Sequence, residues 1–145
     1  MLIDIIYPGW VPFLDLALAD FLPGYVAAHD IALSYDFDTF IGGHYGRTGD
    51  RADVETAREY ISDLLDSCRG VLRNAASLVD ISLVIEQNPE NIIARGRAST
   101  EQLASLCAAP VQEKWIGRLA GVDTAVLSHA TRVIFGLRIE YGEFP

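Results

Sequence analysis

The chain has 145 residues, half of them hydrophobic, and a net charge of −9. This length suits one domain, residues 1–145, with a substantial core, and the hydrophobic content argues against disorder. The negative charge argues against partners that are nucleic acids or anionic membranes. We expect a cytoplasmic protein, because no apolar run reaches the length of a membrane span and the N-terminus does not resemble a signal peptide.

The first predicted element is a strand over residues 2–7, a β-branched apolar run that ends at Pro8-Gly9. Asp4 lies inside this run, where a buried carboxylate would need a cation or a hydrogen-bond donor; on an edge strand it could instead face water. Residues 14–21 predict a short helix and residues 25–35 a longer one. His29 lies in the middle of the longer helix, and we expect it to be solvated.

The chain is organised around residues 37–50. Residues 39–41 predict a buried strand that stops at a Gly-Gly pair and presents His44. Asp50 is then expected to cap a long amphipathic helix over residues 51–78, with Asp53 completing the capping box. The apolar spacing places Ile61 and Leu65 on the core side of this helix.

The remainder predicts further helices. Residues 79–85 fit either a strand or a helix, Ser99 is expected to cap the next helix together with Gln102, and Asp123 is expected to cap the last one. The two cysteines, Cys68 and Cys107, are expected to be small buried hydrophobes in a reducing compartment. The overall expectation is a helix-rich α/β domain with few strands and four or five helices.

Two features together resemble the second half of the metallo-β-lactamase-like hydrolase superfamily. One is the Asp of the predicted strand ending in Pro-Gly-Trp, and the other is the Gly-Gly-His of residues 42–44 followed by a capped helix. The resemblance implies a partial αββα fold, with Asp4 as a metal-bridging carboxylate and His44 as the last histidine ligand. Carboxylate oxygen and imidazole nitrogen suit zinc.

The chain lacks the His-x-His-x-Asp-His motif that carries most of the family's metal ligands. Two ligands do not make a zinc site, so any zinc site here is expected to be weak or incomplete. The resemblance covers only half of the family's fold, which leads us to expect a truncated relative. An uncovered apolar face then predicts a homo-oligomer, or a partner chain that supplies the missing half.

Three functions remain open from the sequence. The first is an oligomeric binding or assembly module without hydrolase activity of its own, and the second is a metal-dependent hydrolase completed in trans by another chain or a second copy. The third is a helical protein that binds a small molecule in an apolar cavity lined by four aromatic residues, Trp10, Phe13, Tyr25 and Trp115.

Overall fold

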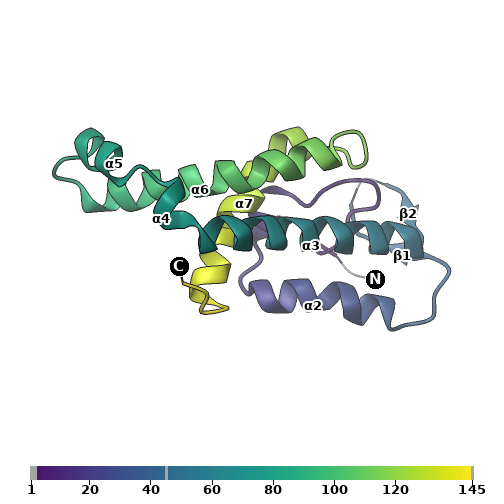
Figure 1. The fold of residues 1–145 in the computed structure, drawn as a ribbon. Coiled ribbons are helices and arrows are strands. Elements are labelled where there is room, and N and C mark those ends of the chain that lie inside the picture. Colours follow the sequence, from purple (N-terminus) through teal and green to yellow (C-terminus); the bar gives the residue numbers. More distant parts are fainter. Residues whose placement is uncertain (1–2, 45, 145) are drawn as a thin grey trace.

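The computed structural model describes residues 3–44 and 46–144, and these are predominantly helical (Figure 1). The chain order of the elements is α1 Leu14–Leu18, α2 Leu22–Leu33, β1 Phe40–Ile41, β2 Thr48–Gly49, α3 Arg51–Arg73, α4 Ala75–Leu78, α5 Ile81–Gln87, α6 Ile92–Trp115 and α7 Val122–Ile139. The two short strands pair antiparallel, with Phe40 opposite Gly49. The helix-rich class with few strands is therefore confirmed. Within the described ranges, no helix combines the length and apolarity that a membrane crossing requires.

Helix α3 is the centre of the core. It packs against α2 on one side and against α6 and α7 on the other (Figure 1). The predicted core positions on α3 are confirmed, since Ile61 is 2% exposed and Leu65 is 4% exposed. A continuous apolar stripe at helical spacing allows one helix to contact three others.

The predicted start of α3 is also confirmed. The Asp50 side chain accepts a hydrogen bond from the Asp53 backbone N–H at 3.1 Å, and the Asp53 carboxylate accepts one from the Asp50 N–H at 3.1 Å. The end was predicted too late, because Asn74 leaves helical geometry at φ −110° and ψ 11° and separates α3 from α4. Residues 79–85, left open from the sequence, lie mainly in α5.

The strand predicted over residues 2–7 is wrong for the part that the structure describes. Residues 3–5 form a turn in which Asp4 has a φ of 64°, and Tyr7 makes only an isolated bridge to Trp10. The next backbone partners lie between α6 and α7, where the Val11 N–H donates to the Ala120 carbonyl at 3.0 Å. Ile6 and Tyr7 are buried, at 0% and 2% exposed, whereas Ile3 is 49% exposed, so an apolar run in a turn was misread as a strand.

Helix α1 is shorter than predicted and has the opposite hand. Asp15 to Leu18 all have φ between 54° and 58°, a left-handed geometry that costs about 1–2 kcal/mol per residue. Tertiary contacts offset this cost, because Leu16 is 0% exposed and Ser128 both donates to the Asp15 carboxylate at 2.6 Å and accepts from the Asp15 N–H at 2.8 Å. Local sequence propensity cannot predict a turn that depends on a residue so far along the chain.

Two predicted caps in the C-terminal half are wrong. Asn91, not Ser99, caps α6, by accepting from the Ala94 N–H at 3.0 Å. The Ser99 position therefore falls inside α6. Gly121, with a φ of 80°, occupies the N-cap position of α7, and Asp123 lies in the first turn. An acidic residue there still favours the helix, because it faces the positive end of the helix dipole.

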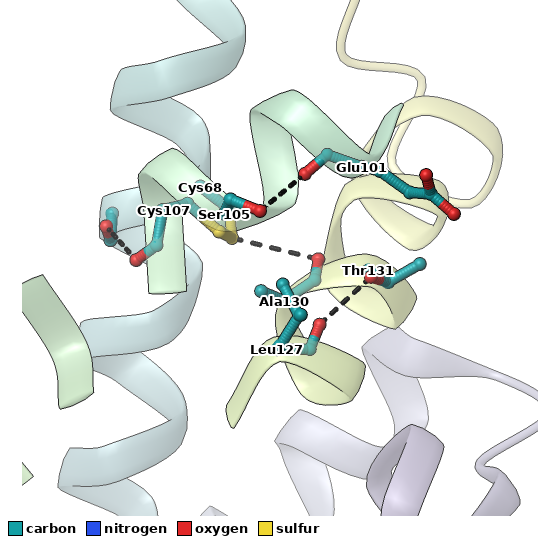
Figure 2. Close-up of a disulfide and its surroundings, with 8 residues drawn as sticks. Cys68, Glu101, Ser105, Cys107, Leu127, Ala130 and Thr131 are labelled. Carbon is teal, nitrogen blue, oxygen red and sulfur yellow. Dashed lines mark hydrogen bonds between the residues drawn. A yellow bond between two sulfur atoms is a disulfide. The ribbon is translucent and has the colours of Figure 1, made fainter. Parts of the chain in front are cut away.

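The two cysteines form a disulfide, contrary to the expectation of free thiols. Cys68 on α3 and Cys107 on α6 join through sulfur, with their Cα atoms 4.9 Å apart (Figure 2). Both residues are 0% exposed. The Cys68 sulfur also lies 4.0 Å from the Ala130 carbonyl oxygen on α7. An oxidised sulfur has no hydrogen to donate, so that contact is packing, and the disulfide sits where the three helices meet.

The disulfide should stabilise the fold. It links residues 39 positions apart, a separation for which loop closure predicts about 4 kcal/mol of stabilisation. Urea unfolding of the oxidised and the fully reduced protein measures this difference. The Cys107→Ala variant is the control, since its stability should not respond to a reducing agent. Equal unfolding midpoints for oxidised and reduced wild type would contradict the prediction.

Candidate functional site

The structure brings Asp4 and His44 together. Nε2 of His44 lies 2.5 Å from Oδ1 of Asp4, although the residues are 40 positions apart. The Tyr7 hydroxyl donates to the same carboxylate oxygen at 3.2 Å. Both side chains reach water, because those of His44 and Asp4 are 36% and 55% exposed. The pair is therefore a surface feature and not part of the core.

Two glycines before His44 make the close contact between His44 and Asp4 possible. A Cβ on Gly42 would lie 2.6 Å from the Ile6 carbonyl oxygen and 2.7 Å from Cδ of Pro8, so a side chain there would push Ile6 and Pro8 away. Gly43 has a φ of 89°, which glycine adopts readily and other residues rarely do. The Gly-Gly pair was predicted to present His44, and it allows His44 to reach Asp4.

Three aromatic contacts hold the imidazole in place. The His44 ring stacks on Tyr7 with centroids 5.4 Å apart, and Phe13 meets the His44 ring edge-on at 5.1 Å. Tyr7 and Phe13 also contact each other, at 5.0 Å. An imidazole packed between two rings has its orientation fixed before any ligand arrives.

As arranged, this pair does not fit a zinc ion. Two donors on one tetrahedral zinc lie roughly 3.3 Å apart, given metal–ligand distances near 2.1 Å. The Asp4 and His44 donors are only 2.5 Å apart and share a hydrogen bond. Among the residues that the structure describes, no group of three His, Cys, Asp or Glu side chains could hold a metal ion. The geometry is that of a hydrogen bond between a carboxylate and an imidazole.

The four aromatic residues expected to line a cavity have different surroundings. Trp115 is 0% exposed and donates its ring N–H to Asp63 at 2.7 Å, whereas the Tyr25 hydroxyl donates to the Ile5 carbonyl at 2.9 Å. Trp10 and Phe13 are partly at the surface, 40% and 44% exposed. Each ring is thus accounted for by its own local contacts, and a shared cavity stays a prediction.

His129 has a structural role. It is 0% exposed, and its Nδ1 accepts from the Tyr60 hydroxyl at 2.7 Å while Nε2–H donates to the Phe13 carbonyl at 2.9 Å. Both ring nitrogens are occupied, and burial lowers the pKa of the imidazole, so it stays neutral. Ser128 points instead to Asp15, as expected for adjacent helical residues.

His29 is buried, contrary to the prediction from the sequence. It was expected to be solvated, yet it is 1% exposed and packs between α2 and α3. Its Nδ1 lies 3.0 Å from the Tyr25 carbonyl oxygen, whereas Nε2 is buried without a hydrogen-bond partner. Apolar residues at positions 25, 26, 32 and 33 surround it on the helix, and this spacing was the available signal that position 29 faces inward.

Comparison with known proteins gives no match, whether with protein-family models, with curated proteins or with solved structures. The function of this chain is therefore inferred from its own residues.

The two buried histidines predict a pH dependence of stability. Burial lowers the pKa of His29 and of His129 below the ordinary value near 6.5. As the pH falls through that value, the unfolded chain takes up protons that the folded chain does not, so the free energy of unfolding should fall. The limiting slope is about 2.7 kcal/mol per pH unit for two histidines.

Urea unfolding between pH 7.5 and 5.5 measures this slope. The variant His29→Gln removes one of the two buried imidazoles, so it should have about half of the wild-type slope. A free energy of unfolding that stays flat across this range would show that both imidazoles accept protons in the folded state.

Proposed function

We propose that this protein is a non-catalytic binding and assembly module that associates with further copies of itself. The observation that carries the proposal is the arm, which we define as α5 together with residues 92–99 of α6. In Figure 1 the arm extends away from the body formed by α2, α3 and α7. Residues 92–99 include no buried side chain, and among them only the partly buried Ala98 packs against the core.

The arm exposes large apolar side chains. Ile92 and Ile93 are 77% and 79% exposed, and Ile81 on α5 is 52% exposed. Neighbouring isoleucines in water lose the free energy that burial would supply, about 1.5–3 kcal/mol for each side chain. A partner surface over the arm recovers that energy and stabilises helical turns that are marginal alone.

A second copy of the chain fits this surface. Each arm carries both signs of charge, with Glu86 and Glu90 on one side of the turn and Arg95 and Arg97 on the other. In a two-fold arrangement, the acidic part of one arm faces the basic part of its partner. The expected self-association is then an isologous contact between arms.

The relationship to the second half of the metallo-β-lactamase-like hydrolases is part of the same proposal. It is supported by the contact of Asp4 with His44 and by the Gly-rich turn that leads into the capped start of α3. A cytoplasmic location is also kept as a proposal. It is compatible with the disulfide because Cys68 and Cys107 are both 0% exposed and therefore shielded from small thiols.

A second candidate is a metal-dependent hydrolase completed in trans. The observation that favours it is that a carboxylate and an imidazole converge at an exposed position, where another chain can reach them. A zinc ion there would need further ligands from that chain, and Asp4 and His44 would have to separate to receive it. We place this candidate second because the pair is already closed by its own hydrogen bond.

The first proposal predicts a dimer or larger assembly at micromolar concentration. The double variant Ile92→Asp/Ile93→Asp should become monomeric, because it places charge on the proposed interface. Acidic residues are favourable in the first turn of a helix, so α6 should remain intact. Sedimentation velocity measures the change in mass. Ile31→Asp on α2 is the matched control, since Ile31 is 57% exposed but lies outside the arm. A monomeric wild type would overturn the proposal.

The second candidate predicts weak zinc binding at Asp4 and His44. His44→Ala should abolish that binding in a calorimetric titration while changing the melting temperature little, because an ion pair that reaches water contributes little to stability. Asp38→Ala, which removes an exposed carboxylate elsewhere, should bind like wild type. Unchanged zinc binding by His44→Ala would show that the metal site suggested by the family resemblance lies elsewhere or does not exist.

A further inference from the structure

A hollow of about 260 Å³ lies between α2, α3 and the segment after α7. Val26, Ile61 and Leu65 form an apolar wall on one part of its lining, and Asp30, Arg58 and Arg69 make another part charged. His29 contributes to the same lining and is 1% exposed. The hollow is separate from both the arm and the Asp4–His44 pair, since it shares no lining residue with either.

The chemistry of His29 is fixed by its neighbour on the helix. The Tyr25 carbonyl oxygen can only accept a hydrogen bond, so Nδ1, 3.0 Å away, carries the hydrogen. Burial lowers the pKa of the ring, which keeps it neutral. Nε2 therefore presents a lone pair, and it is a buried polar atom without a partner. A buried acceptor of this kind favours a ligand that brings a donor.

The charges around the hollow indicate a neutral ligand. Arg58 pairs with Asp30, and Arg69 pairs with Glu143 at 3.0 Å and with Asp66 at 3.7 Å. Two guanidinium groups thus face three carboxylates. No net positive charge remains to attract an anion, and the apolar wall disfavours a cation.

We propose that this hollow binds a small neutral molecule with an apolar ring and one hydroxyl group, whose hydroxyl donates to Nε2 of His29. The apolar wall of α2 and α3 side chains would cover the ring. The volume is sufficient, because an apolar cavity of about 150 Å³ already accommodates benzene. This inference goes beyond the assembly role and does not depend on it.

Phenol and toluene form a suitable pair of probes. They have the same shape, and only phenol can donate a hydrogen bond. Titration of the full-length protein, followed by amide chemical shifts, should show saturable phenol binding with the largest shifts in residues around His29. Toluene should bind about tenfold more weakly, which is the effect of one hydrogen bond of about 1.4 kcal/mol.

Two variants locate the site. Ser62 is exposed on α3 and lines the hollow, so Ser62→Trp should block it and abolish phenol binding. Ser82→Trp, at an exposed position on α5, is the matched control and should bind phenol like wild type. The proposal fails if phenol does not saturate, which would mean that water alone occupies the hollow. It also fails if toluene binds as tightly as phenol, or if Ser62→Trp and Ser82→Trp bind phenol equally.

Discussion

The contact of α3 with three other helices is the constraint on which the rest of the structure depends. Leu64 and Cys68 lie on its fully buried face, and the disulfide ties that face to α6. Polar side chains of α3 also bind residues at and after the end of α6. Asp63 accepts from the Trp115 ring N–H at 2.7 Å, and Glu59 pairs with Arg118 at 2.9 Å. These two acidic residues thus help to position the end of α6. The apolar stripe supplies most of the stabilisation, since exposed ion pairs contribute little.

How far the fold could be predicted depended on where each element finds its hydrogen bonds and contacts. Helix α3 was predictable, because its capping box and its apolar spacing are both local in sequence. The segment before Pro8 was not, because the burial of Ile6 and the exposure of Ile3 arise only in the folded chain. The left-handed turn at Asp15 depends on Ser128, 113 positions away, which no local rule reveals. A local cause was thus needed for a correct prediction but did not guarantee one, since the local Asn91 cap of α6 was missed.

The candidate sites, too, could be predicted only in part from the sequence. The convergence of Asp4 with His44 could be anticipated from the family resemblance, even though the strand assumed for Asp4 is a turn. The Gly-Gly pair was the informative feature, because a close backbone approach requires glycine whatever the surrounding secondary structure. His29 was assigned to solvent from its residue type, although the apolar spacing around it on α2 indicated that position 29 faces inward. Its environment depends on packing between α2 and α3, which only the folded chain defines.

The chain's three histidines show how partner chemistry, and not residue type, decides function. His129 has both ring nitrogens occupied, so it can only hold α7 against the segment before α1. His44 is hydrogen-bonded to a carboxylate near the surface, where a second chain can reach it. His29 differs from both, because it combines full burial with an unused acceptor beside a hollow. Leaving a buried acceptor unsatisfied costs about 1–3 kcal/mol. That cost is the physical reason to look for a ligand at His29, whereas at His129 there is none.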